Sequence, residues 1–170
     1  MSEFAATGLV GTVSVAGSIS GYFPIRYFKF KPVLITGYVI MTISMGLMAI
    51  FSLIEEFIGF LVCMNIFMYV YQTTLGTLSW LYPSEILVDA ANGIAVLVLN
   101  LMILLTSTTT QYIIESPIRP AGLFFFYTFV LAVSLIITIF YMRETKGLSK
   151  ASKKILYYPK YLRESLDQTQ

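Results

Sequence analysis

Histidine is absent from the 170 residues, and the chain has a single cysteine, Cys63. Without histidine, neither a Ser/His nor a Cys/His catalytic pair can form. Metal clusters of histidine and cysteine are excluded for the same reason. Cys63 lies inside an apolar run, where we interpret it as a packing residue, and it has no partner for an intrachain disulfide. We therefore predict no metal, no cofactor and no enzymatic activity.

Charged residues are also scarce, because Asp, Glu, Lys and Arg make up 12% of the chain while hydrophobic residues make up 57%. A water-soluble surface cannot be built from this composition, which is typical of membrane proteins. The net charge of +2 is small, and the basic residues lie at the ends of apolar segments, so a nucleic-acid-binding surface is not expected. The lipid bilayer is the predicted partner.

Five apolar runs are long enough to cross a bilayer, which takes roughly 20 mainly apolar residues per helix. The runs are continuous and too long for the strands of a membrane β-barrel, which alternate in polarity over about ten residues. We therefore predict an all-α membrane protein with a helical bundle over residues 1–147 and a cytoplasmic tail over 148–170. The predicted spans are 4–25, 32–54, 57–82, 93–114 and 121–142.

The basic residues predict the orientation, because cytoplasmic loops are enriched in Lys and Arg. If the five spans alternate in direction, Arg119 lies alone on one side of the membrane and all the other basic residues lie on the opposite side. The first loop, the third loop and the C-terminal tail are then cytoplasmic. The N-terminus is predicted to lie on the other face.

Small residues line one face of the first span, where Gly17 and Gly21 also form a GxxxG spacing. Residues at steps of three and four share a helical face. The members of this face are Thr7, Gly11, Ser14, Ser18 and Gly21. We interpret the face as a surface for close helix packing.

A stripe of polar and aromatic residues runs along the third span: Asn65, Tyr69, Gln72, Gly76 and Trp80. Amides in hydrocarbon need partners, so the stripe is expected to face protein or a water-filled cavity. Amide and indole donors beside an aromatic plate suit a neutral polyhydroxylated ligand. Interhelical hydrogen bonding, with Trp80 as an interfacial anchor, is the alternative interpretation.

The fourth span has a second polar stripe, formed by Asn100, Ser107 and Gln111. The neighbouring threonines at 106–110 can bond their own helix backbone, so they carry little information about a ligand. Asn100 and Gln111 are therefore the further candidates for a substrate path.

Three motifs in this chain resemble the sugar porter family of the major facilitator superfamily. The stretch G-T-L-S-W-L-Y-P-S-E over residues 76–85, followed by Asn92-Gly93, is similar to the tryptophan-containing tenth helix and the following Ser-Glu and Arg-Gly of that family. R-E-T-K-G over residues 143–147 resembles the P-E-T-K-G signature that follows the twelfth helix. K-P-V-L-I-T-G over residues 31–37 is similar to the end of the basic loop between helices eight and nine.

The resemblance implies that the five spans are helices eight to twelve, in the C-terminal half of a carrier. It implies transport of a hexose or related polyol by alternating access, with Trp80 on the sugar path and a proton as a possible co-substrate. The N-terminal half and a seventh helix rich in amides are then missing partners. A six-helix half begins and ends in the cytoplasm, so the odd number of spans also suggests one further helix upstream.

In the family, cytoplasmic acidic residues pair with basic residues to close an inner gate. The resemblance gives the acidic roles to Glu85 and Glu144, and the possible basic partners are Arg26, Lys29, Lys31 and Lys146. Three positions depart from the family pattern, because Asn92, Ser79 and Arg143 replace an arginine and two prolines. The gate is therefore expected to be weaker or to use different pairs of residues.

Two alternatives remain open. The chain could belong to a carrier for organic ions or other solutes from a neighbouring facilitator family. It could also be a truncated membrane fragment that transports nothing, because five helices cannot enclose a path by themselves.

Overall fold

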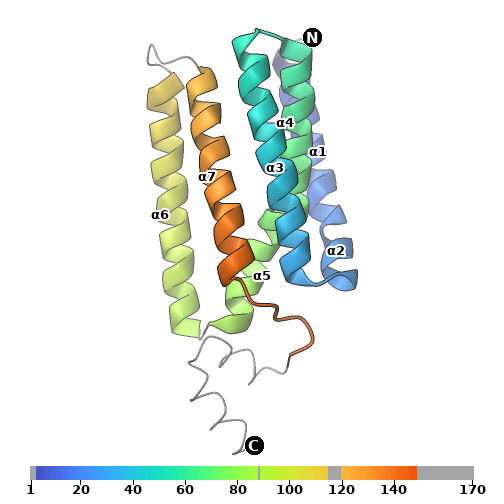
Figure 1. Cartoon of the computed structure of the whole chain (residues 1–170), viewed down its shortest axis with the longest axis vertical. Coiled ribbons are helices and arrows are strands. Elements are labelled where there is room, and N and C mark those ends of the chain that lie inside the picture. Colours follow the sequence, from blue (N-terminus) through green and yellow to red (C-terminus); the bar gives the residue numbers. More distant parts are fainter. Residues whose placement is uncertain (1–2, 88, 115–119, 149–170) are drawn as a thin grey trace, which may run out of the picture.

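The computed structural model describes residues 3–87, 89–114 and 120–148, and within these ranges every regular element is helical (Figure 1). Two glycine-containing sites interrupt the helices, at Gly21 and at the segment η1. The elements in chain order are α1 (Glu3–Ser20), α2 (Tyr22–Tyr27), α3 (Phe30–Leu53), α4 (Phe57–Tyr71), η1 (Gln72–Gly76), α5 (Thr77–Ile86), α6 (Asp89–Ile114) and α7 (Pro120–Tyr141).

Five of the helical stretches are long and apolar enough to cross a membrane: Thr7–Tyr27, Phe30–Leu53, Phe57–Ser84, Ala91–Thr110 and Ala121–Tyr141. The predicted all-α membrane class and the number of spans are confirmed. The first span extends two residues beyond the predicted position 25, and the fourth covers 91–110 where 93–114 was predicted. The predicted tail from residue 149 onward lies outside the described residues.

The first span changes direction at Gly21, between α1 and α2. Pro24 has no backbone N–H, so it cannot donate to the carbonyl of Ser20 one turn earlier, and a helix is weakened at such a position. The chain then leaves α2 through Phe28, whose extended backbone leads into α3. This short turn places the ends of α2 and α3 side by side.

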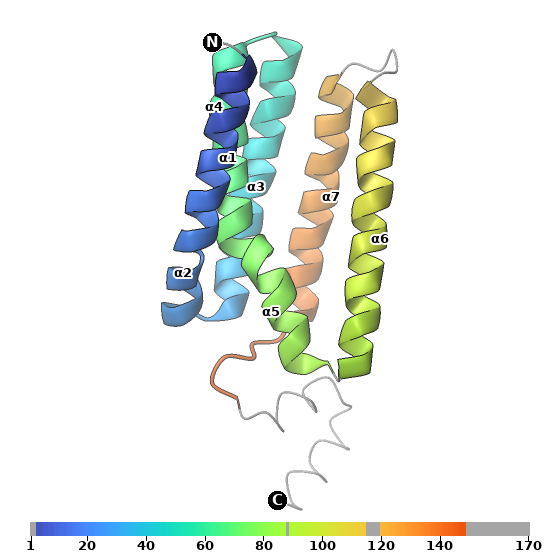
Figure 2. The same cartoon turned by 180° about the vertical axis from the view of Figure 1, so that it is seen from behind.

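The α3 helix lies between α7 and α4, and α4 in turn packs against α1 (Figures 1 and 2). The α6 helix stands beside α7 at the edge of the bundle, and α5 bends away from α4 toward the lower end of α6 (Figure 2). None of the span Ala91–Thr110 on α6 is buried. The large apolar side chains that face outward suit a lipid environment.

Two apolar clusters hold the helices together, one toward each end of α3. The first has buried Phe30, Val33, Leu34 and Leu78, and it joins α3 to α5. The second has buried Met45, Met48 and Cys63, with aromatic side chains of α4 and α7 packed around them. Cys63 is 6% exposed, which confirms its interpretation as a packing residue.

Close backbone approach occurs where glycines face the third span. A Cβ atom on Gly17 would lie 2.9 Å from the carbonyl oxygen of Tyr69, and one on Gly21 would lie 2.8 Å from Oγ1 of Thr77. The packing interpretation of this GxxxG pair is therefore confirmed. A Cβ atom on Gly11, which belongs to the predicted small face, would have nothing within 4 Å, so the close contact is confined to the end of α1 near Gly21.

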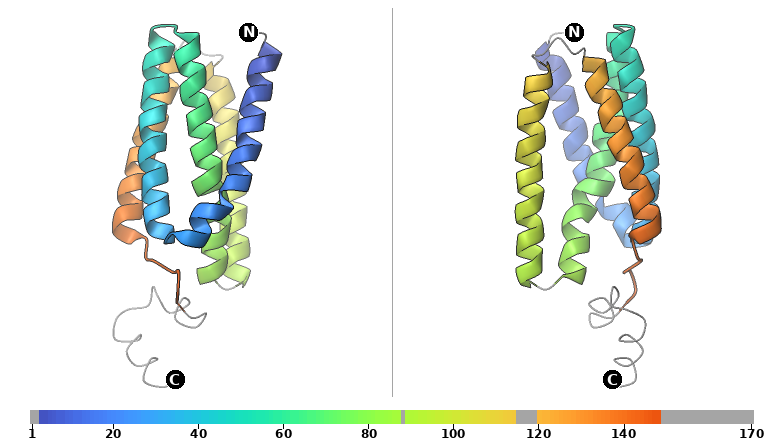
Figure 3. Two further views of the ribbon diagram at one scale, coloured as in Figure 1. Left: turned by 90° about the vertical axis from the view of Figure 1, so that its right-hand side faces the viewer. Right: turned by 60° about the vertical axis from the view of Figure 1, so that its left-hand side comes forward.

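The two ends of the bundle differ in charge. Arg26, Lys29 and Lys31 lie where α2 meets α3, at the end of the molecule that also holds Lys146 after α7 (Figures 1 and 3). Glu55 and Glu56 lie at the opposite end, in the turn between α3 and α4. Arg119 lies outside the described residues.

Candidate functional site

The polar stripe of the third span is divided among three helical elements. Asn65 and Tyr69 lie on α4, Gln72 and Gly76 begin and end η1, and Trp80 lies on α5. Tyr69 and Trp80 are 41% and 52% exposed, so both aromatic rings present large surfaces outside the packed core. The stripe therefore continues along the whole third span, but the residue spacing that keeps it on one helical face changes at η1.

Asn65 has an incompletely satisfied side chain. Its Nδ2 donates a hydrogen bond of 2.8 Å to the carbonyl of Leu61, within the same helix. Its Oδ1 is buried and accepts no hydrogen bond from the residues that the structure describes. A buried acceptor without a hydrogen bond is costly, so Asn65 is unsatisfied in this arrangement of the described residues.

The η1 segment is a single turn of π-helix, a form that is rare and frequently found at functional sites. The hydroxyl of Thr77 donates to the carbonyl of Gln72 over 3.1 Å, across five residues, and so satisfies a backbone group at the wider turn. A Cβ on Gly76 would lie 2.7 Å from Oε1 of Gln72. The glycine therefore gives the Gln72 amide room to fold back over the helix.

Trp80 meets the fourth span at a small cavity of about 70 Å³, whose wall includes Ser79, Asn92 and Val96. Asn100 lies further along α6, where it is exposed and donates a 2.8 Å hydrogen bond from Nδ2 to the carbonyl of Val96. The backbone of Gln111 belongs to α6, but its side chain lies outside the described part of the structure. Among the described candidates, Trp80 is thus close to α6, whereas Asn65 lies about four helical turns from Trp80 along the third span.

A second feature lies at the basic end, where Glu144 caps α3. Its Oε1 accepts a 3.0 Å hydrogen bond from the backbone N–H of Phe30, and its Oε2 accepts one of 3.1 Å from the backbone N–H of Lys31. These are the first two residues of α3. A carboxylate at a helix N-terminus satisfies free N–H groups and interacts favourably with the positive end of the helix dipole. Glu144 also accepts from the backbone N–H of Lys146, at 3.1 Å.

Lys146 binds the opposite kind of helix end, the C-terminus of α2. Its Nζ donates hydrogen bonds of 2.7, 2.6 and 2.7 Å to the carbonyls of Ile25, Arg26 and Phe28. A cation at a helix C-terminus interacts favourably with the negative end of the dipole. Lys31 donates in the same way to the carbonyl of Ile139 near the end of α7, at 2.7 Å. We call Glu144, Lys146 and Lys31 the helix-end clasp.

The helix-end clasp brings together three of the predicted gate residues, which hydrogen-bond to backbone groups where side-chain ion pairs were expected. The side chain of Arg26 lies over the rings of Tyr22 and Tyr27, 5.9 and 6.0 Å from their centres. Lys29 is exposed at the N-cap position of α3. The side chain of Glu85 lies outside the described part of the structure, so its pairing stays a prediction.

A comparison with protein families shows the family to which the chain belongs. The model of the family described as sugar (and other) transporter matches residues 1–154. The chain belongs to the sugar transporter family. No curated protein and no solved structure matches it.

Membership of the sugar transporter family confirms the predicted family and, with the five apolar helices, supports an integral membrane protein. The match extends past α7 and includes the E-T-K-G motif, whose Glu144 and Lys146 form the helix-end clasp together with Lys31. The family match does not show that the five spans are helices eight to twelve. It also does not identify the substrate or the orientation, so these stay predictions.

Two structural features of this sugar transporter family member were not predicted from its sequence. The π-helical turn was predicted as continuous helix, although Gly76, a cluster of threonines and Pro83 are all signs of a weakened helix. The backbone partners of Glu144 and Lys146 were missed because they lie more than a hundred residues away in the chain.

Proposed function

We propose that this chain forms part of a carrier that moves a hexose or a related polyol across a membrane by alternating access. The family match over residues 1–154 carries the proposal. The described helices then correspond to helices eight to twelve of a sugar porter, which the position of the E-T-K-G motif directly after α7 supports. The carrier changes the position of its substrate and makes no covalent change in it.

The end of the bundle that holds the helix-end clasp faces the cytoplasm in this proposal. Arg26, Lys29 and Lys146 lie at that end, and Glu55 and Glu56 lie at the other. An excess of basic residues is typical of the cytoplasmic side. The C-terminus is therefore cytoplasmic.

The substrate path runs along the polar stripes of the third and fourth spans. Asn65 supports this assignment, because its Oδ1 has no hydrogen-bond donor among the described residues; in this proposal the side chain rotates to expose that oxygen to a sugar hydroxyl. The exposed ring of Trp80 offers a plate for the C–H face of a sugar. The proposed path residues are Asn65, Gln72, Gly76, Trp80, Asn100 and Gln111.

The path needs a second wall. In this fold the ligand lies near the middle of the bilayer, between two halves that rock against each other. We propose that an N-terminal half supplies that wall and packs on the exposed faces that α6 and the third span present. The π-helical turn lets the lower part of the third span bend during this motion, because its wider turn lacks the regular hydrogen-bond ladder.

The cytoplasmic gate is proposed to contain Glu85, Glu144, Arg26, Lys29, Lys31 and Lys146. The helix-end clasp ties α2, α3 and the end of α7 into one unit, so these ends move together when the gate opens. Exposed ion pairs with the other half contribute only about 0–1 kcal/mol each, so several are needed to bias the two states.

Uptake of radiolabelled glucose into proteoliposomes tests the proposal. The chain is reconstituted alone and together with the first seven helices of a characterised sugar porter, supplied as a separate polypeptide. We expect uptake only with both parts, with competition by unlabelled hexoses. Competition by organic cations without competition by hexoses would indicate the neighbouring facilitator families, and no uptake in either preparation would indicate a fragment that does not transport. A change in uptake with a proton gradient separates symport from facilitated diffusion.

A pair of variants tests the path itself. Asn65→Leu is expected to lower uptake about tenfold, the effect of one lost hydrogen bond of roughly 1.4 kcal/mol to the substrate. Ile66→Leu, at the exposed neighbouring position on α4, is the matched control. Equal uptake by both variants would contradict the role of Asn65.

A further inference from the structure

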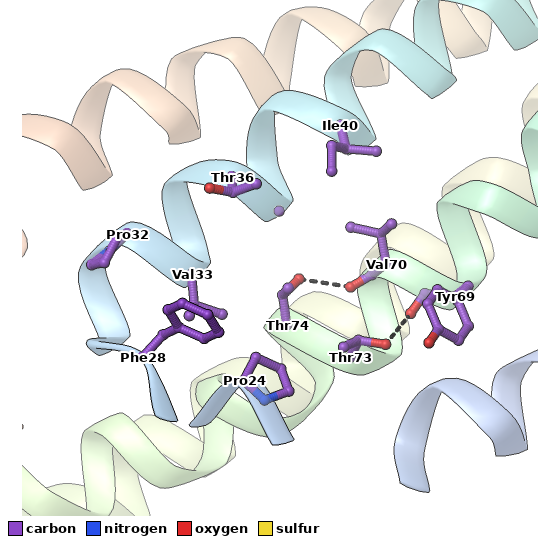
Figure 4. Close-up of a pocket in the computed structure, with 11 residues that line it drawn as sticks. Pro24, Phe28, Pro32, Val33, Thr36, Ile40, Tyr69, Val70, Thr73 and Thr74 are labelled. Carbon is purple, nitrogen blue, oxygen red and sulfur yellow. Dashed lines mark hydrogen bonds between the residues drawn. The ribbon is translucent and has the colours of Figure 1, made fainter. Parts of the chain in front are cut away.

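A groove of about 360 Å³ lies between α2, α3 and the junction of α4 with η1 (Figure 4). Pro24 and Phe28 form one wall, Pro32, Val33 and Ile40 form the other, and Val70 lies on the floor beside η1. Figure 3 shows α1 and α3 diverging around α4 on this side of the molecule. The groove is therefore separate from the polar stripe assigned to the sugar path, except at Tyr69.

The polar groups of the groove floor are already used inside their own helix. The hydroxyls of Thr73 and Thr74 donate 2.7 Å hydrogen bonds to the carbonyls of Tyr69 and Val70, as the dashed lines in Figure 4 mark. Gly37 lies against Thr74 and adds no polar side chain. The hydroxyls of Thr36 and Tyr69 also line the groove, but the remaining side chains of its wall are apolar, so the groove suits a hydrocarbon chain better than a sugar.

The length and depth of the groove fit one leaflet of a bilayer. Pro32 and Ile40 are separated by eight residues of α3, which is about 12 Å at 1.5 Å per residue. One leaflet contributes half of a hydrocarbon layer of about 30 Å. Tyr22, Phe23 and Tyr27 are exposed at the end of the groove, and aromatic side chains of this kind are enriched at the level of the lipid headgroups.

An exposed cation stands at the same end. Lys29 is the exposed N-cap residue of α3 and lies in the chain between Phe28 and Pro32, which both line the groove. The neighbouring Lys31 and Lys146 donate to backbone carbonyls. Among the described residues, no acidic side chain pairs with Lys29, whose side chain is exposed.

We propose that this groove binds an anionic phospholipid, with one acyl chain along α3 and the phosphate-containing headgroup on Lys29. The inference rests on the proposed orientation, which puts the groove in the cytoplasmic leaflet, where anionic lipids are concentrated. It does not depend on which solute the carrier moves. A bound acyl chain lies against η1 and so contacts the segment proposed to bend.

Photolabelling of the purified full chain in detergent micelles tests the site. The probes are phosphatidylserine and phosphatidylcholine that each bear a diazirine in one acyl chain, and labelled positions are read by mass spectrometry. We expect phosphatidylserine to label the groove at Ile40 and Val70. Lys29→Gln is expected to lower this labelling about fivefold and to leave that by phosphatidylcholine unchanged. Arg26→Gln is the charge control, because Arg26 is not among the residues that line the groove and its side chain lies over the rings of Tyr22 and Tyr27.

A second variant fills the groove. Thr36→Trp is expected to abolish labelling at Ile40, whereas Phe140→Trp, at an exposed position on α7, is expected to leave it unchanged. If Thr36→Trp does not fold, displacement of the label by plain phosphatidylserine but not by phosphatidylcholine on the unaltered chain supports the site. Labelling only outside the groove, equal displacement by both lipids, or displacement by glucose would overturn the proposal. Because no transport is measured, a failed uptake experiment leaves this result unaffected.

Discussion

Glu144 lies 114 residues after Phe30 in the chain, yet its carboxylate accepts the backbone N–H of Phe30 at 3.0 Å. The last described segment of the chain thus caps α3, a helix near the beginning of the chain. Two residues later, Lys146 donates to carbonyls at the end of α2, so a short segment with one negative and one positive side chain serves two helix ends of opposite polarity.

Glu144→Gln is expected to lower the free energy of unfolding by about 1–2 kcal/mol, because a neutral amide caps a helix less well than a carboxylate. The measurement is thermal unfolding in detergent micelles, followed by circular dichroism. Glu56→Gln is the matched control, since Glu56 holds the N-cap position of α4 without a side-chain hydrogen bond to it. A similar loss in both variants would contradict the capping role of Glu144.

Lys146→Met is expected to cost about 1.5–3 kcal/mol of unfolding free energy, because three carbonyls lose a charged donor. Lys146→Arg is expected to recover only part of the loss, since a planar guanidinium cannot direct three donors at carbonyls that converge on a single nitrogen. Lys29→Met, compared in micelles without added lipid, is the control. Full recovery with arginine would show that the charge alone matters and the geometry does not.

Gly37→Ala is expected to destabilise the bundle by about 1–3 kcal/mol, the usual cost of overpacking. The new Cβ would lie 2.5 Å from Oγ1 of Thr74, which is buried and bonded to its own helix. Gly11→Ala has open space and is expected to be neutral or to stabilise α1 by up to about 1 kcal/mol. Chemical unfolding of both variants measures the difference, and equal stability would remove the proposed contact between α3 and η1.

Glu55→Gly is expected to stabilise the turn between α3 and α4 by about 1 kcal/mol, because Glu55 has a left-handed backbone with φ 56°. Glycine adopts that conformation without strain. Glu56→Gly is the control, since its φ of −84° suits any residue and glycine there offers no relief. A loss of stability in Glu55→Gly would mean that the carboxylate contributes more than the strain costs.

The long apolar runs made the number of spans predictable, because a helix in hydrocarbon satisfies its own backbone groups and needs no other part of the chain to do so. Glycine spacing also predicted the contact at Gly17 and Gly21, since small residues are what close helix packing requires. These features depend on local composition. They can be read without knowing where other segments lie.

The π-helical turn and the helix-end clasp could not be read in this way. Whether Gln72 to Gly76 forms a wider turn depends on Thr77, whose hydroxyl bonds the Gln72 carbonyl, and on the close approach of Gly37 and Gly21 from other helices. The partners of Glu144 follow from how α7 and α3 pack. For an exposed carboxylate, pairing with a nearby cation was the simpler expectation, and free backbone N–H groups at a helix start become visible only once the helices are placed.

The helix-end clasp also imposes an order on biosynthesis. Helix α3 is complete in the growing chain at Leu53, but the carboxylate that caps it is added only at position 144, after the last span. During synthesis the start of α3 and the end of α2 therefore lack their hydrogen-bond partners, Glu144 and Lys146, until three more spans have been made. A chain that stops just before Glu144 contains all five described spans but leaves both of these helix ends without the clasp, so residues made after the fifth span hold α2 and α3 together.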